Sequence, residues 1–249
     1  MGITIKNIEE IEAMKIAGRI TACALEVARQ AIRPGITTAE LDRLCEEYIM
    51  DMKAKPSFKG YYGYPASICA SVNDVVIHGI PSDYALKDGD IISIDVGAYI
   101  GGYHGDAART FAVGQISDED KRLIEVTRQS FYEGIKFARE GNYLNDVSSA
   151  IQKYVEANGF SVVRDYVGHG IGKQMHEAPN VPNFKTIRKG PRLTAGMTLA
   201  IEPMVNIGTY RVKQLGDGWT VVTGDGRKAA HYENTVLITS DAPQLLTCI

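Results

Sequence analysis

Four acidic side chains lie in segments that otherwise have the composition of buried β-strands. They are Asp95 in IISIDVG, Asp106 eleven residues later beyond a Gly-Gly turn, Glu202 in LAIEPMV and Glu233 at the start of ENTVLI. Burying an unpaired carboxylate costs several kcal/mol, so each of these acids needs a compensating partner. A shared proton or the nearby Arg109 could compensate the first pair. Four acids in apolar strands that contain no buried bases favour one common cause.

That common cause is predicted to be metal. In a hairpin centred on Gly101-Gly102, Asp95 and Asp106 point to the same face as direct or diagonal neighbours. His169, flanked by glycines in GHGIG, adds an imidazole ligand. Two Asp, two Glu and one His suit a pair of divalent cations, for which Mn²⁺, Fe²⁺, Zn²⁺ and Co²⁺ are the candidates. Two such ions activate water, so hydrolysis is the leading chemistry.

Four further histidines stand near these positions. His78 ends the apolar run VVIH before a Gly-Ile-Pro turn, and His176 follows His169 by seven residues. Each is placed to hydrogen-bond a substrate or a developing oxyanion, and a purely structural role is the alternative for each. His104 and His231 lie two residues before Asp106 and Glu233, which makes them weaker candidates for an outer shell around the ligands.

The elements that must position these residues occur in a repeated order. Hydrophobic periodicity predicts helices over 8–32, 38–53, 118–140 and 145–157, and strands over 67–72, 91–99, 103–113 and near 160–167, 197–207, 219–223 and 232–239. A shift of 106 residues superposes Arg33-Pro34-Gly35 on Arg139-Glu140-Gly141 and aligns the second helix of each set. We therefore predict an α/β (α+β) protein with one domain over 1–249. Two related halves, about 8–113 and 117–240, would join their sheets under helices on one side.

Composition excludes several broad classes. The 249 residues carry 27 basic and 30 acidic side chains, a net charge of -3. Such a balance argues against a DNA-binding protein and against attachment to an anionic membrane. No apolar run is long enough to span a membrane, and no signal peptide is visible. The four cysteines form no CxxC pair, which indicates free thiols and a cytoplasmic location.

The ordered set Asp95, Asp106, His169, Glu202 and Glu233 resembles the ligand set of the methionine aminopeptidases, most closely the bacterial type I enzymes. The strings SVNDVVIHGIP, DGDIISIDVG, GYHGD, VGHGIG and GMTLAIEPMVN carry the same resemblance over essentially the whole chain. It implies a pita-bread fold and two metals bridged by Asp106 and Glu233. Asp95 would complete one metal and His169 with Glu202 the other. Glu202 would act as general acid and base, His78 would contact the substrate amide, and His176 would stabilise the tetrahedral intermediate.

The resemblance also implies a methionine pocket and a substrate. The pocket would be formed by Phe58, Tyr61, Tyr64, Cys69, Met175 and Trp219. Phe58, Met175 and Asn234 depart from residues familiar in enterobacterial relatives. The implied activity is removal of the initiator methionine from nascent polypeptides with a small second residue, by a monomer. The alternatives are a proline-specific peptidase of the same fold and a non-catalytic binding module. Contact of the basic stretch Lys185, Arg188, Lys189 and Arg192 with the ribosome is a further expectation.

Overall fold

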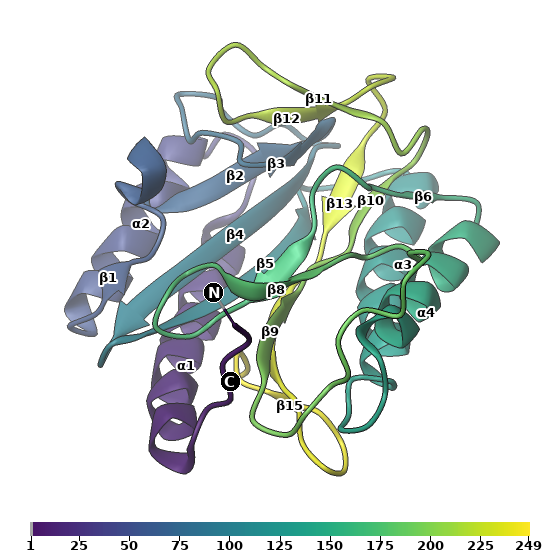
Figure 1. Cartoon of the computed structure of the whole chain (residues 1–249). Coiled ribbons are helices and arrows are strands. Elements are labelled where there is room, and N and C mark those ends of the chain that lie inside the picture. The colour runs from purple at the N-terminus through teal and green to yellow at the C-terminus, as the bar shows by residue number, and fades with distance from the viewer. Residues whose placement is uncertain (1) are drawn as a thin grey trace.

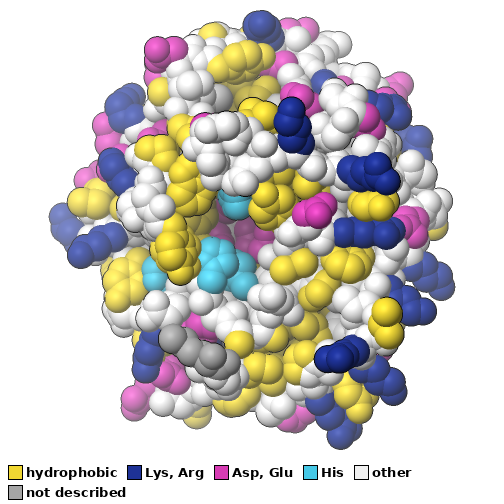
Figure 2. Space-filling model, turned by 45° about the horizontal axis from the view of Figure 1, so that its top comes forward, with side chains coloured by type: hydrophobic (Ala, Val, Ile, Leu, Met, Phe, Trp, Pro, Cys, Tyr) yellow, Lys and Arg dark blue, Asp and Glu magenta, His cyan; other side chains and the backbone are white. Residues whose placement is uncertain are grey.

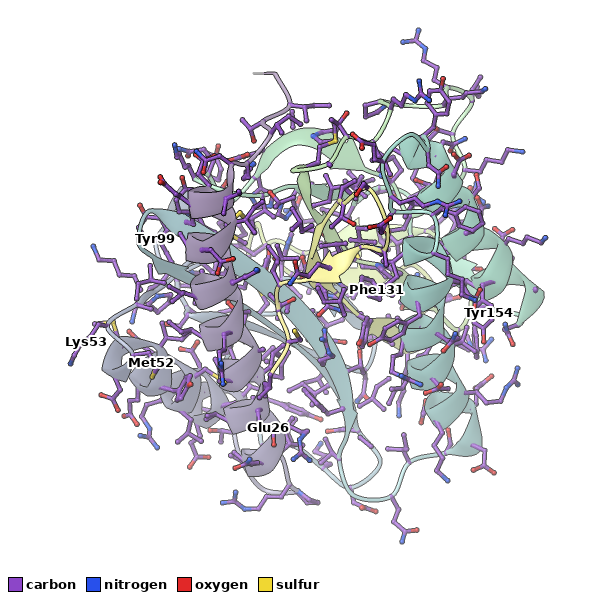
Figure 3. The ribbon with its side chains drawn as sticks, turned by 90° about the horizontal axis from the view of Figure 1, so that it is seen from below. Glu26, Met52, Lys53, Tyr99, Phe131 and Tyr154 are labelled. Atoms are coloured by element: carbon purple, nitrogen blue, oxygen red, sulfur yellow. The ribbon has the colours of Figure 1, made fainter. Side chains whose placement is uncertain are left out.

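Two helix pairs flank the strands in the computed structural model, which describes residues 2–249 (Figure 1). The α-helices are α1 (Ile8–Ala31), α2 (Thr38–Asp51), α3 (Asp118–Ile135) and α4 (Leu144–Ala157), with a 3-10 turn η1 (Tyr61–Gly63). Seen from below, the two helix pairs lie to the left and right with strands between them (Figure 3). Phe131 of α3 is buried in the core, whereas Lys53, just after α2, points to solvent. Among the described residues no helix is long and apolar enough to cross a membrane.

Most strands of the first half form an antiparallel sheet around one long strand. The first-half strands are β1 (Lys55–Pro56), β2 (Ile68–Val72), β3 (Val75–Ile77), β4 (Ile91–Ile100) and β5 (Tyr103–Ala112). β4 pairs with β1 and β2 along one edge and with β5 along the other. α1 packs against β4 and β5, so the first helix covers the long hairpin directly.

The second half contains shorter strands. They are β6 (Ser161–Val162), β7 (Gly168–Gly170), β8 (Glu177–Val181), β9 (Thr198–Ile201), β10 (Met204–Asn206), β11 (Val212–Gln214), β12 (Val221–Thr223), β13 (Ala229–His231), β14 (Asn234–Leu237) and β15 (Gln244–Leu245). They form the orders β15-β14-β9-β7-β8, β13-β10-β6 and β11-β12-β3. β12 therefore pairs with a strand of the first half.

The helices begin and end where their local sequence dictates. Asn7 caps α1 by accepting from the Glu10 N–H, and the Glu10 carboxylate accepts from the Asn7 N–H. Ser117 likewise accepts from the backbone of Asp120 at the start of α3. α3 ends at Ile135, earlier than expected, because the chain tightens into three-residue turns before Gly141 takes a positive φ of 91°.

The strand predicted over 197–207 is interrupted at its centre. β9 pairs with β14 and β10 pairs with β13 in one continuous register, which sets Glu202 opposite Glu233 at the break. Pro203 has no N–H to donate, and its carbonyl accepts from Tyr232 instead. Glu202 and Glu233 thus lie between strands rather than within them. Because opposite positions of an antiparallel pair share a face, both side chains point the same way.

The two halves meet through a pair of reciprocal threonine contacts. The Thr235 hydroxyl donates to the Asp106 carbonyl and accepts from the Asp106 N–H, both at 3.0 Å. The Thr110 hydroxyl does the same for His231, at 2.9 Å in each direction. The N–H of Glu233 donates to Ala108 between them. β5 is therefore fastened to the β13–β14 segment at the level of the acidic residues.

The predicted repeat agrees with the helices. α2 and α4 have 14 residues each and begin 106 residues apart, which is the shift found in the sequence. Each half then runs helix, helix and antiparallel strands. The segment 160–167 contributes only the two residues of β6, less than predicted.

The backbones of α1 and β5 approach each other closely at Gly105. A Cβ built at Gly105 would lie 2.7 Å from the backbone Cα and N of Gly18 in α1, and no flexible side chain can move aside. We expect Gly105→Ala to lower the free energy of unfolding by about 1–3 kcal/mol, measured by urea denaturation. Gly216→Ala is the matched control, because open space surrounds Gly216. Equal stability of the two variants would contradict the close approach.

Candidate active site

One cavity gathers the side chains that the sequence singled out. It has a volume of about 370 Å³ and opens to solvent as a hollow with acidic side chains inside and histidines beside them (Figure 2). All thirteen predicted site residues line it, joined by Tyr62: Phe58, Tyr61, Tyr64, Cys69, His78, Asp95, Asp106, His169, Met175, His176, Glu202, Trp219 and Glu233. The residues come from both halves of the chain.

The acidic side chains arrive in two pairs, one from each half. In the β4–β5 ladder, Asp106 stands opposite Gly97 and Asp95 opposite Ala108, so the two aspartates are diagonal neighbours, as predicted. Glu202 and Glu233 face the same space from the interrupted ribbon of the second half. Each half thus contributes a two-stranded ribbon that carries two carboxylates.

The centre of the cavity has the donor set of a metal site. Ligand atoms of Asp106, His169 and Glu233 all lie within 4.8 Å of one another. One carboxylate oxygen each of Asp95, Asp106 and Glu233 is buried without a hydrogen-bond partner among residues 2–249. Buried polar atoms normally have partners, so three unpartnered carboxylate oxygens in one cavity fit the binding of cations.

Electrostatics lead to the same conclusion. Burial raises the pKa of Asp95 and of Glu233 well above the ordinary range, and repulsion from the other carboxylates adds to the shift. Burial also raises the pKa of Asp106. Burial opposes charge on His169, but Asp106 and Glu202 outweigh it and raise the pKa of the imidazole. Divalent cations bound here would favour the ionised carboxylates over their protonated forms and offset this repulsion.

His169 is oriented from both of its ring nitrogens. Nδ1 lies 2.9 Å from the Gly170 carbonyl, so it carries the proton and donates. Nε2 then points into the cavity, 3.6 Å from Asp106 and 3.7 Å from Glu202. An imidazole that binds a metal through one ring nitrogen usually donates a hydrogen bond from its other ring nitrogen to a carbonyl or carboxylate oxygen.

Arg109 does not neutralise the aspartates. Its guanidinium donates to the backbone carbonyls of Ala108 and Glu233 and to the Asn234 side chain, and it lies 4.1 Å from the centre of the Tyr232 ring. It therefore joins β5 to the start of β14 and leaves the carboxylates free. Asn234, one of the departures from the familiar pattern, accepts this bond and another from Thr247.

His78 has a backbone conformation that residues other than glycine rarely adopt. Its φ is +58°, in the left-handed region. The adjoining Gly79 is held against β2, where its carbonyl accepts from Ala70 and its N–H donates to Ser71. A Cβ at Gly79 would lie 2.4 Å from the Ala70 carbonyl oxygen, so only glycine fits there. This clamp turns the imidazole into the cavity, where burial lowers its pKa and keeps it neutral.

Aromatic rings form two walls. On one side His169, His176, Tyr61 and Tyr62 follow each other with centroids 4.0, 5.3 and 4.6 Å apart. On the other side Tyr166, His78, Trp219 and Tyr64 are spaced by 5.9, 6.4 and 5.1 Å. The side chains of Phe58, Cys69 and Met175 are buried in the same cluster. A narrow apolar cavity with an acidic end is the result.

The loop that carries Met175 and His176 is held by the N-terminal segment. Lys6 is buried and donates to Glu177 at 2.6 Å, and Thr4 donates to the same carboxylate at 2.5 Å. The other Glu177 oxygen accepts from the Gln174 backbone across the loop. Residues 4–6 thus brace the segment beside the catalytic histidine candidate.

Several contributors were missed in the sequence. Tyr62 and Tyr166 are loop tyrosines with no periodic signal, and Lys6 lies 171 positions from Glu177. His231 was predicted as an outer neighbour of Glu233, yet its Nε2 lies 3.6 Å from Glu202. His104 bonds Ser57 rather than an acid. Of these residues, only His104 and His231 could be found in the sequence, because each lies two residues before a candidate acidic ligand.

Comparison with known proteins places these residues in context. Residues 12–240 match metallopeptidase family M24. The methionine aminopeptidase of Clostridium perfringens is 60% identical over 99% of each chain. The crystal structure of the methionine aminopeptidase of Thermotoga maritima has a TM-score of 0.98, 47% identity and full coverage of both chains. A prolidase from Pyrococcus furiosus shares the fold alone, at 24% identity and a TM-score of 0.81, with 98% of this chain and 65% of that one covered.

Breaking the Lys6–Glu177 pair should destabilise the protein in a pH-dependent way. Burial works against the Glu177 carboxylate, but the bonds from Lys6 and Thr4 hold its pKa below the ordinary value. We expect Lys6→Met to lower the free energy of unfolding by about 3 kcal/mol at pH 7, because it leaves a buried charge unpaired.

The loss of unfolding free energy caused by Lys6→Met should be smaller at acidic pH. A carboxylate with a lowered folded pKa stabilises above its unfolded value of about 4.3, and that stability disappears as the pH falls through the folded pKa. Denaturation of wild type and variant at pH 7 and below pH 4 measures the difference. The double variant Lys6→Met/Glu177→Gln is the control and should recover part of the loss. A loss that is independent of pH would argue against an ionic origin.

Proposed function

The chain belongs to metallopeptidase family M24 and, within it, to the methionine aminopeptidases, and we propose that it removes the N-terminal methionine from polypeptides whose second residue is small. Its fold is the pita-bread fold that the sequence resemblance implied. The observation that supports the proposal most directly is the convergence of five candidate ligands and two neutral histidines in one cavity. A non-catalytic module would have no need to keep them all.

Membership of a metallopeptidase family implies divalent metal ions. We propose two ions per chain, which Asp95, Asp106, His169, Glu202 and Glu233 would hold. The orphaned oxygens of three of these acids support this arrangement. When bound, divalent cations polarise a carbonyl group and lower the pKa of water. Carboxylates with one imidazole suit Mn²⁺, Fe²⁺, Co²⁺ and Zn²⁺.

Glu202 is proposed as general acid and base. Its side chain retains 13% exposure, more than the 5% of Asp106, so water can reach it at the inner end of the cavity. A carboxylate in that place accepts a proton from attacking water and returns it to the leaving amine. The leaving amine is the nitrogen of the second substrate residue.

The two helper histidines act as neutral hydrogen-bonding groups. Burial and the nearby His169 lower the pKa of His176 to about 4, so its ring is uncharged at neutral pH. Its Nδ1 lies 2.9 Å from the Tyr61 hydroxyl, which donates to it and leaves the proton on Nε2. That N–H is available to the oxyanion of the tetrahedral intermediate. His78, on the opposite wall, is proposed to contact the substrate amide.

The methionine side chain is proposed to enter the apolar part of the cavity. Phe58, Tyr61, Tyr64, Cys69, Met175 and Trp219 line it. A flexible thioether makes favourable contacts with aromatic rings and sulfur, and burial keeps the Cys69 thiol protonated by raising its pKa. Phe58 and Met175, which depart from enterobacterial relatives, are both buried in this wall. The cytoplasmic location and the ribosome contact through Lys185 to Arg192 stay predictions.

Methionine release tests the reaction. The metal-loaded protein should release methionine from Met-Gly-Met-Met and leave Gly-Pro intact. Glu202→Gln keeps the shape but cannot take up a proton, so we expect it to lower kcat by about 10²–10⁴-fold. Glu9→Gln, the same change at an exposed position of α1, controls for handling of variants. Cleavage of Gly-Pro with no methionine release would favour a proline-specific peptidase instead.

Metal binding is tested without turnover. Because binding to the folded state alone is stabilising, Mn²⁺ or Co²⁺ should raise the Tm of the metal-free protein in a concentration-dependent manner. Asp106→Asn and Glu233→Gln should each abolish most of that rise while raising the Tm of the metal-free form, since each removes a repelled buried carboxylate. A metal-dependent rise that persists in both variants would place the ions elsewhere.

A further inference from the structure

Tyr62 is the outermost ring of an aromatic row that begins at the acidic centre. The row runs from His169 through His176 and Tyr61, and Tyr62 completes it with an edge-to-face contact at 4.6 Å. His169 and Tyr62 are at its extremes: His169 is 6% exposed and Tyr62 86%. The row therefore leads from the reacting bond to solvent.

The backbone holds Tyr62 in this exposed place. Its φ of +47° and ψ of 24° are left-handed, between Gly60 and Gly63, which also have positive φ. The turn is closed by bonds from Gly60 to the Tyr64 carbonyl and from Gly63 to the Gly60 carbonyl. Tyr61 and Tyr64 on either side face inward and are fixed by His176 and by the Ile68 and Gly79 carbonyls. The turn thus presents one large ring outward at the mouth.

The geometry points to a binding site for the polypeptide beyond the cleaved bond, and we propose that Tyr62 contacts the third and fourth residues of the substrate. This inference rests on the proposed function. The steps from His176 to Tyr61 and to Tyr62 are 5.3 and 4.6 Å, and an extended peptide advances about 3.3 Å per residue. With the reacting bond at His176, the Tyr62 ring lies at most about three residues beyond it, within reach of the third and fourth residues of the substrate.

A contact with Tyr62 would favour longer peptide substrates and bulky side chains at their third and fourth residues. A dipeptide ends before it reaches Tyr62, whereas a nascent chain continues past it. An exposed ring that already rests on Tyr61 loses little conformational freedom on binding, and it offers a face to apolar or aromatic side chains. Tyr62 would therefore be a specificity-determining residue that distinguishes polypeptides from short methionine-containing peptides.

The experiment compares two substrates in each protein, Met-Ala-amide and Met-Ala-Ala-Phe-amide, with the metal-loaded full chain. We expect Tyr62→Asn, which tolerates positive φ, to lower the ratio of kcat/KM for the tetrapeptide to that for the dipeptide by about three- to tenfold, mainly through KM. Tyr62→Phe keeps the ring and should keep the wild-type ratio. Phe137→Ala removes a ring that is 43% exposed outside this cavity and should also keep the wild-type ratio.

Three results would overturn the inference. They are an unchanged ratio in Tyr62→Asn, an equal fall in Tyr62→Phe, and the same fall in Phe137→Ala. Methionine release from Met-Ala-amide by the wild type reports the proposed function separately, because that substrate does not reach Tyr62. Absence of release from both peptides by the wild type would refute the proposed function, and the inference with it.

Discussion

Carboxylates that share a buried cavity repel one another, and the centre of this protein places four of them around one imidazole. The raised pKa values of Asp95 and Glu233, and the unpartnered oxygens of these two acids and of Asp106, express the same unfavourable energy. The remaining structure holds the acids together against that repulsion. It does so with backbone ladders and with the Thr110 and Thr235 hydroxyls, which fix the strands rather than the carboxylate groups. The ligand oxygens therefore stay available for cations.

Rigid and adaptable parts of the site come from different kinds of element. The acids lie on or between strands, and their spacing is set by register. The two histidines proposed to contact the substrate lie in loops, and each loop is braced from elsewhere: His78 by the clamp of Gly79 on β2, and His176 by Lys6 through Glu177. Side chains of the proposed methionine pocket, such as Phe58 and Met175, can thus vary without disturbing the candidate metal ligands.

The sequence predicted the acidic centre well because its signal is local. A carboxylate inside an apolar run is anomalous by itself, and one hairpin was enough to pair Asp95 with Asp106. The opposition of Glu202 to Glu233 depends on a register between segments about 30 residues apart, and the break at Pro203 appears only in the structure. The roles of Lys6 and Tyr62 could not be predicted. Lys6 contacts a residue 171 positions away, and Tyr62 lies in an exposed turn, so neither belongs to a periodic hydrophobic pattern.

The reciprocal threonine contacts have a consequence for how the two halves are joined. Asp106 and His231 lie 125 residues apart, as do Thr110 and Thr235. A threonine of the second half therefore binds the backbone of the first half, and a threonine of the first half binds the backbone of the second half in the same way. Contacts of that form are isologous, and they are what two identical subunits make across a twofold axis. The seam is thus built like a homodimer interface within one polypeptide. Covalent linkage makes its formation independent of protein concentration, so dilution cannot separate the ligands that the metal site needs from each half.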